Sequence, residues 1–90
     1  MTRADIVEHI NYLGLEDEEI ILFDGMEDAF LGIAERFEDH GHVYFAVYSY
    51  EKMVLIVEED MDVDDAVDYL EFNVVGLYAG PGTPAILRDF

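Results

Sequence analysis

The pattern of apolar positions predicts a short helix at the start of the chain. Ile6, Ile10 and Leu13 recur at helical spacing, together with Val7. Thr2 and Asp5 have the spacing of a capping box, and Gly14 supplies a stop after the last apolar position.

The next two segments predict a strand followed by a longer helix. Residues 20–23 form an apolar run after the acidic residues 16–19, which is typical of a short strand. Residues 26–37 place six apolar side chains on one helical face, with Gly32 allowing a close approach to a neighbour and Asp39-His40-Gly41 ending the helix. A helix of this length could carry a parallel crossover to the next strand.

A central strand and a third helix are predicted next. Residues 43–48 are rich in β-branched and aromatic side chains without polar alternation, so both faces of this strand should be covered. Ser49 can cap a helix over residues 50–59, although residues 53–57 are also strand-like. We expect the helix.

The last third of the chain predicts a fourth helix, a turn and a strand. Asp62 and Asp65 have N-capping spacing before apolar positions that keep a 3.6-residue period to Leu77. Residues 80–83, Gly-Pro-Gly-Thr, suit a type II turn, and residues 85–89 suit a strand. The whole pattern predicts an α/β fold in which about three short strands form one sheet that is packed by about four helices.

Composition and charge narrow the class of protein. The 90 residues fit one acidic globular domain spanning residues 1–90, and an apolar share of 52% is too high for a disordered acidic tail. Lys and Arg number 4 against 22 Asp and Glu, a net charge of −18. An acidic surface with almost no Lys favours a protein that works in molar salt, where the Debye length falls to about 3 Å.

Charge, cysteine content and the length of the apolar runs argue against several functions. The four basic residues are scattered along the chain and form no basic patch, so we expect no direct binding to nucleic acid. Cysteine is absent, which removes disulfides, thiolate metal sites and cysteine nucleophiles. The longest apolar runs are far shorter than the roughly 18 residues of a spanning helix, so we expect no membrane span.

Four sequence blocks stand out between residues 20 and 86. They are Phe23-Asp24-Gly25 with Asp28-Ala29, Gly32 and Arg36; Val47-Tyr48-Ser49-Tyr50-Glu51-Lys52; Tyr69-Leu70-Glu71-Phe72-Asn73-Val74-Val75-Gly76; and Gly80-Pro81-Gly82-Thr83-Pro84. In these blocks the chain resembles a family of small uncharacterised proteins of tailed phages, proviruses and some prokaryotes. The resemblance implies no activity, and it suggests a haloarchaeal or haloarchaeal-virus source because this chain is far more acidic than is common in that family. It also implies a location in a host cytoplasm or a virion.

One spacing resembles a calcium loop. Asp60, Asp62, Asp64 and Glu71 occupy positions one, three, five and twelve of an EF-hand pattern. The sixth position, which is normally Gly, is Asp65, so we favour an acidic helix N-terminus that complements free backbone amides. We expect no metal and no cofactor, and these four residues are the one weak calcium candidate.

Other candidate chemistry has simpler explanations. His40 and His42, with His9 elsewhere, are spaced as a metal pair could be, but a histidine pair around a Gly is more often a solvent-facing connection. Ser49 is better explained as a helix cap than as a nucleophile, and no catalytic triad is legible. We therefore expect a non-enzymatic protein.

The candidate interaction residues are Asp24, Arg36, Tyr50 and Asn73. Arg36, a lone cation on the predicted second helix, could pair with Asp24, with Asp28 or with a partner's carboxylate, or it could pair within its own helix. Tyrosines that reach the surface would be good interface anchors.

Two hypotheses follow. The first is a protein-interaction, accessory or structural module that is adapted to high salt and acts through a protein partner or self-association. The second is an acidic nucleic-acid mimic that blocks a host DNA-binding or defence protein.

Overall fold

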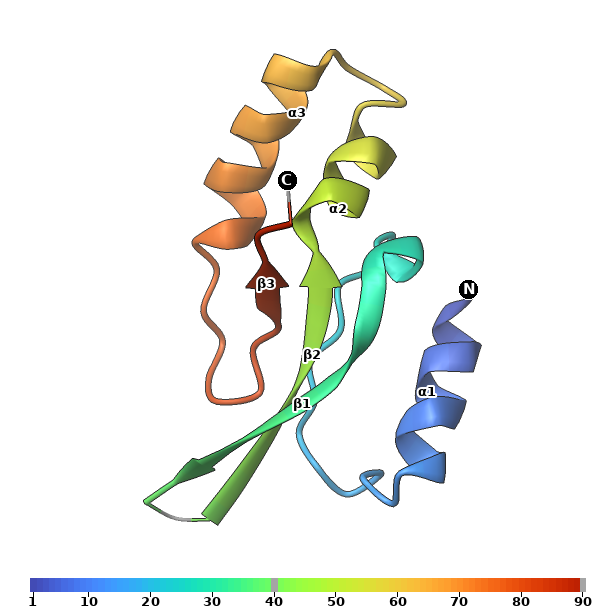
Figure 1. Cartoon of the computed structure of the whole chain (residues 1–90), viewed down its shortest axis with the longest axis vertical. Coiled ribbons are helices and arrows are strands. Elements are labelled where there is room, and N and C mark those ends of the chain that lie inside the picture. The colour runs from blue at the N-terminus through green and yellow to red at the C-terminus, as the bar shows by residue number, and fades with distance from the viewer. Residues whose placement is uncertain (40, 90) are drawn as a thin grey trace.

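The computed structural model describes residues 1–39 and 41–89 and has the predicted α/β fold. Three α-helices and a three-stranded mixed sheet lie in this part of the chain, one helix fewer than expected (Figure 1). In chain order the elements are α1 (Arg3–Tyr12), a 3₁₀ turn (Glu27–Ala29), β1 (Phe30–Glu38), β2 (Gly41–Ser49), α2 (Tyr50–Val57), α3 (Val63–Leu70), a π-helical turn (Glu71–Val75) and β3 (Ala85–Leu87).

The strand order of the sheet is β1-β2-β3. β1 and β2 form an antiparallel hairpin along their whole length, from the pair Phe30 and Tyr48 to the pair Glu38 and Gly41. β3 runs parallel to β2 and pairs only with its last three residues, 47–49. The crossover between these parallel strands runs through α2 and α3. Residues 41–46 of β2 therefore have a strand on one side only.

The predicted helix over residues 26–37 is wrong, because most of this segment is strand β1. Its apolar residues fit a 3.6-residue period, but Phe and Ile also favour a pleated strand, and pairing with β2 decides between the two. Gly32 has a φ of 156° at a shift in the β1–β2 register, a backbone conformation that suits glycine in a strand irregularity. The predicted parallel crossover through this segment is wrong for the same reason.

The predicted strand over residues 20–23 is also wrong. β2 pairs with β1 along its length and with β3 at residues 47–49, whereas residues 20–23 run beside the sheet and form no strand pair. It is tied down by other contacts: the Ile21 amide donates to the Gly82 carbonyl at 3.1 Å, and the Phe23 amide donates to the Tyr48 hydroxyl at 3.1 Å. The apolar run is half-buried against the core, as its composition suggests.

The predicted helix caps are confirmed. Thr2 and Asp5 form a capping box on α1. The Ser49 hydroxyl accepts from the Lys52 amide at 3.1 Å at the start of α2, which confirms a helix here rather than a strand. The Asp62 carboxylate accepts from the Asp65 amide at 2.9 Å at the start of α3. α3 ends at Leu70, and the π-helical turn continues its path to Val75, so the fourth predicted helix is shorter than expected.

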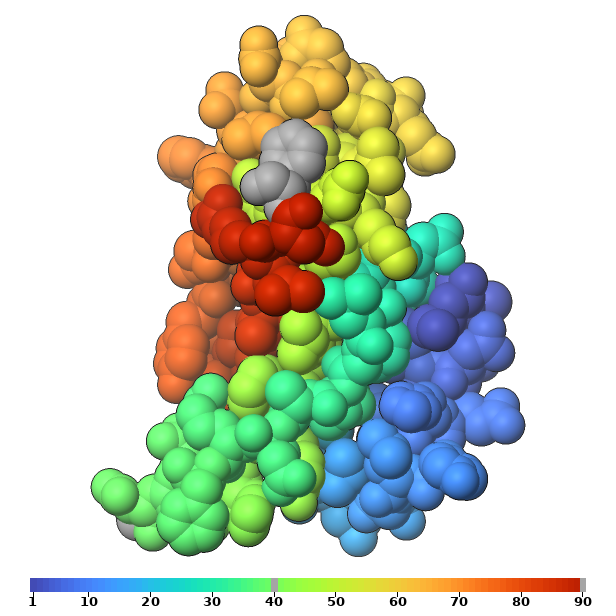
Figure 2. All heavy atoms as spheres, in the orientation of Figure 1, coloured from blue at the N-terminus to red at the C-terminus, as the bar shows by residue number. Residues whose placement is uncertain are grey.

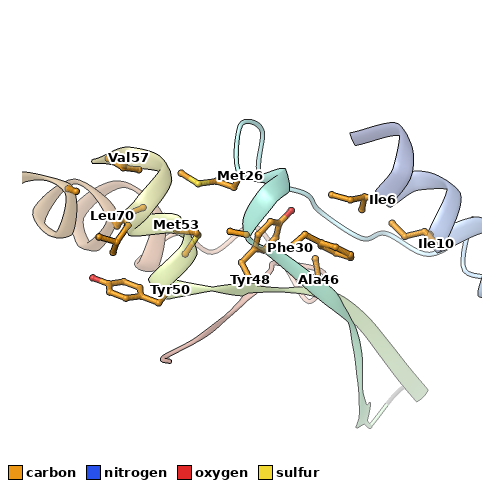
Figure 3. Packing of buried hydrophobic residues seen from close by; sticks show 13 residues of the cluster. Ile6, Ile10, Met26, Phe30, Ala46, Tyr48, Tyr50, Met53, Val57 and Leu70 are labelled. Carbon is orange, nitrogen blue, oxygen red and sulfur yellow. The ribbon is translucent and has the colours of Figure 1, made fainter. Parts of the chain in front are cut away.

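The core runs along the sheet from α1 to the α2–α3 pair (Figure 3). Ile6 and Ile10 of α1 lie at one end, and Val57 of α2 and Leu70 of α3 lie at the other. Tyr48 is fully buried between them. Its ring packs against Phe23 at a centroid distance of 4.9 Å and against Phe30 at 5.8 Å. The distal half of the β1–β2 hairpin extends away from this core.

Candidate functional site

The distal half of the hairpin projects from one end of the molecule (Figure 2). Two cavities, of about 390 and 240 Å³, lie between this part of the hairpin and the turn at residues 80–83. They share His42, Val43 and Pro81 as lining residues, and Tyr44 lines the smaller one. We call this combined hollow, bounded by those four residues, the hairpin groove.

Aromatic side chains form the strand side of the groove. The His42 ring lies edge-on to Phe37 at a centroid distance of 5.2 Å and stacks on Tyr44 at 6.3 Å. Its Nδ1 is 2.8 Å from a carboxylate oxygen of Glu35, which holds the ring in place on the strand. Burial, and then the negative charge of Glu35, raise the pKa of the Tyr44 phenol, so its hydroxyl stays a hydrogen-bond donor at neutral pH.

A tightly held turn forms the opposite side. The Thr83 amide donates to the Gly80 carbonyl at 3.1 Å, and the Thr83 hydroxyl donates to the same carbonyl at 2.7 Å. Gly82 is buried against the backbone of Glu19, so closely that a Cβ on Gly82 would collide with the Glu19 carbonyl oxygen. A turn at residues 80–83 is thus confirmed, but it is not the expected type II turn, because that type needs a positive φ at Gly82, and the positive φ of 108° is at Gly80 instead. The turn packs on the acidic residues 16–19 through the backbone of Glu19.

Carboxylates surround the groove. Asp17, Glu18 and Glu19 line the smaller cavity, and Glu38 and Asp39 line the larger one. Within residues 1–39 and 41–89, no ion pair reaches the first three. Carboxylates of one sign on the walls of a concave surface concentrate the negative potential there, which favours a positively charged ligand.

The structure places Arg36 on strand β1, not on a helix. Its guanidinium pairs with Glu38, two residues along the same strand, at 3.2 Å and lies 4.9 Å over the Phe45 ring. The two carboxylates that were expected as possible partners of Arg36 pair with other groups. Asp24 pairs with Arg3 at 2.6 Å, and Asp28 pairs with the Met1 amino group at 3.0 Å. Arg36 therefore takes the arrangement in which it pairs within its own element.

Tyr50 belongs to a second cluster, at the carboxyl end of the sheet. Its side chain is buried, its hydroxyl lies 3.4 Å from Glu71, and the Arg88 guanidinium lies 4.6 Å over its ring. Arg88 binds both carboxylate oxygens of Glu71, at 2.9 and 3.2 Å. This pairing lowers the pKa of Glu71 and raises that of Arg88.

Asp89 completes that cluster. Its carboxylate accepts from the Glu51 amide at 2.9 Å and from the Ser49 hydroxyl at 2.5 Å, and these two bonds lower its pKa. The cluster joins the segment after β3 to the start of α2. Ser49 is therefore occupied both as a cap and as a donor. Asn73 follows Glu71 by two residues, and its side-chain amide donates to the Tyr69 carbonyl at 3.1 Å.

The four predicted interaction residues do not form one site. Tyr50 and Asn73 lie near the carboxyl end of the sheet, Asp24 lies in the loop after residues 20–23, and Arg36 lies on the distal hairpin. Of the four, Arg36 is the one next to the hairpin groove, through its ion pair with the lining residue Glu38.

The calcium candidate is not assembled either. Asp62 is used as the cap of α3, and Glu71, beyond the far end of α3, binds Arg88. In the described part of the chain, no group of three or more His, Asp or Glu residues could hold a metal ion. His9 lies against Phe30 and His42 lines the groove, while His40 is outside the described residues.

No protein-family profile, curated protein or solved structure matches the chain. Among the described residues, none of the helices is both long enough and apolar enough to cross a membrane.

Sequence reasoning did not find the hairpin groove. Its described residues come from three parts of the chain, 17–19, the hairpin residues 38–39 and 41–44, and 81–82, which meet only because the hairpin replaces the expected helix. Tyr44 is half-buried there. The sequence does show the acidic residues 16–19 and the proline turn at residues 80–83. Neither pattern predicts that the two segments lie side by side.

Proposed function

We propose that this chain is a non-enzymatic protein-interaction or accessory module of phage-like or viral origin, adapted to high salt, and that it contacts its partner through the hairpin groove. The groove carries the proposal, because it combines a concave surface, aromatic side chains and a ring of carboxylates on one projecting element. The viral setting comes from the sequence resemblance alone.

The lining chemistry supports a protein as the partner. Aromatic side chains supply large contact area at low entropic cost and are enriched at protein interfaces. Phe37, which lies edge-on to His42, is 76% exposed and adds apolar area beside the groove. A groove of this shape can therefore hold an extended or protruding segment of another chain.

The charge distribution supports adaptation to salt. Three of the four basic residues are engaged with carboxylates of the chain itself: Arg3 with Asp24, Arg36 with Glu38, and Arg88 with Glu71. The net charge of −18 thus lies on a surface of 5895 Å² with little internal neutralisation. Molar salt would screen the resulting repulsion.

A nucleic-acid mimic is the alternative, and it requires carboxylates in rows on one face. Acidic residues occur on α1, in residues 16–19, on the hairpin and densely in residues 58–65 between α2 and α3. The hairpin and the α2–α3 connection lie at opposite ends of the longest axis, which measures 41 Å (Figure 1). This spread supports a salt-adapted shell rather than a mimic.

The test is capture of host proteins from lysate in 2 M KCl with three forms of the chain. One variant, Asp17→Asn with Glu18→Gln and Glu19→Gln, neutralises the groove. A matched control, Glu58→Gln with Glu59→Gln and Asp60→Asn, removes the same charges at the far end. We expect a partner that wild type and control retain and the groove variant loses. Equal capture by all three, or recovery of a DNA-binding protein that DNA competes away, would contradict the proposal.

A further inference from the structure

The edge of β2 beside the groove lacks a strand. β3 pairs with residues 47–49 and no further, while the β1–β2 ladder continues to the pair Glu38 and Gly41. Residues 41–44 line the groove and form about 13 Å of strand, at about 3.3 Å per residue, whose outer side pairs with no strand. This edge continues the line along which β3 is already paired.

The backbone groups along this edge have no partner in the described part of the chain. In an antiparallel ladder, alternate residues direct both their N–H and their C=O away from the neighbouring strand. Two of residues 41–44 thus turn these groups toward the groove, and none of the four makes a backbone hydrogen bond outside the β1–β2 ladder. A row of such groups is a template for pairing with another strand.

We propose that an extended, arginine-rich segment of a partner protein adds to the sheet along residues 41–44 of β2, in the hairpin groove. This inference rests on the proposed function, and it specifies both the mode of binding and the chemistry of the partner. Strand addition supplies backbone hydrogen bonds, while side-chain contacts supply specificity.

Charge complementarity identifies the occupant. Asp17, Glu18, Glu19, Glu38 and Asp39 flank the slot, so cationic side chains on an added strand would meet carboxylates. Arginine suits this slot better than lysine, because a guanidinium also stacks on aromatic rings such as Tyr44 and His42. Stacking and direct contact persist in molar salt, where long-range attraction is screened.

The outer edge of β1 is the competing edge. It carries Glu35, Arg36 and Glu38 and a register shift near Gly32, and charges and irregularities of this kind protect edges from pairing. A second copy of the chain would bring another −18 charges to either edge, which disfavours self-pairing.

The test uses three synthetic seven-residue peptides with isotope-labelled full-length chain in 2 M KCl. The first alternates Arg and Val, the second has the same sequence with alternate backbone nitrogens methylated, and the third replaces Arg by Glu. Binding is measured by NMR titration, and backbone pairing is measured by amide hydrogen exchange.

We expect the Arg peptide to bind and to slow exchange at alternate amides of residues 41–44. Methylation should weaken binding about 30-fold, since it removes two backbone bonds to this edge, each worth about 1 kcal/mol. The Glu peptide should not bind. The groove variant at residues 17–19 should weaken binding severalfold, and the control variant at residues 58–60 should not.

Four results would overturn the inference. Equal binding of the methylated peptide without slowed exchange would mean that the groove binds side chains only, which leaves the proposed function intact. Protection of β1 amides would show that the peptide pairs with the other edge of the hairpin. Formation of dimers in light scattering would show that the occupant is a second copy of the chain. Failure of the Arg peptide to bind would reject the arginine-rich segment, and the capture experiment would still decide the proposed function independently.

Discussion

Replacing Gly82 by Ala should destabilise the fold and disturb the hairpin groove. The buried Gly82 backbone lies against the Glu19 carbonyl oxygen, and an added Cβ would occupy the same space. The Gly82 backbone fixes the position of the added Cβ, and the carbonyl oxygen belongs to the Glu19 backbone. Either the turn or residues 16–19 must therefore move. That movement also threatens the hydrogen bond from the Ile21 amide to the Gly82 carbonyl, at 3.1 Å.

The expected cost is about 2–3 kcal/mol. Overpacking typically costs about 1–3 kcal/mol, and the loss of one backbone hydrogen bond costs about 1 kcal/mol. A gain of about 0.4–1 kcal/mol from the less flexible unfolded chain offsets part of this. At about 4–8 °C per kcal/mol for a domain of this size, Tm should fall by about 10–20 °C.

Gly76→Ala is the matched control. No heavy atom lies within 4 Å of a Cβ at Gly76, and its φ of −83° suits any residue. This variant should keep or slightly raise the stability. Urea and thermal unfolding followed by circular dichroism in 2 M KCl would measure both variants. If Gly82→Ala were as stable as Gly76→Ala, the docking of the turn on residues 16–19 would be refuted.

Three further predictions concern charge and the core. Tm should rise by many degrees between 0.1 and 2 M KCl, and equally in NaCl, because screening relieves the repulsion of a −18 surface; unchanged stability would argue against salt adaptation. Because the bonds from the Glu51 amide and the Ser49 hydroxyl lower the pKa of Asp89, its contribution to stability is present near neutral pH and is lost as pH falls through this lowered pKa. Asp89→Asn should therefore be less stable than wild type at pH 7 in 2 M KCl and should converge with it in acid, whereas a constant difference would contradict this. Tyr48→Phe should cost about 1–3 kcal/mol in urea unfolding, because the Phe23 amide loses its acceptor; a loss below 0.5 kcal/mol would show that the amide finds another partner.

Local signals predicted local structure well. The caps at Thr2, Ser49 and Asp62 were predictable because each depends on residues no more than three positions apart. The turn at residues 80–83 was predictable because Pro and Gly restrict the backbone directly. Burial of residues 20–23 was correct, although their place beside the sheet rather than in it was not.

Non-local pairing accounts for what the sequence could not reveal. Phe30, Ile33 and Phe37 satisfy helical spacing, yet they lie on a strand because β2 pairs with all of residues 32–38. The groove could not be predicted once residues 26–37 were expected to be a helix, because a helix there would not place the hairpin residues beside Pro81. The same pairing decides which carboxylates line the groove. With 22 Asp and Glu in the chain, the local sequence does not distinguish the lining carboxylates from the rest.

The central claim is that the hairpin groove is the contact surface, and mapping the partner on the chain tests it most directly. Amide chemical shifts of isotope-labelled chain would be recorded in 2 M KCl with and without the captured partner. We predict that the largest changes fall on residues 17–19, 38–39, 41–44 and 81–82, which line the groove. Changes concentrated instead on α3 and the π-helical turn, where Phe72 is 89% exposed, would contradict the account.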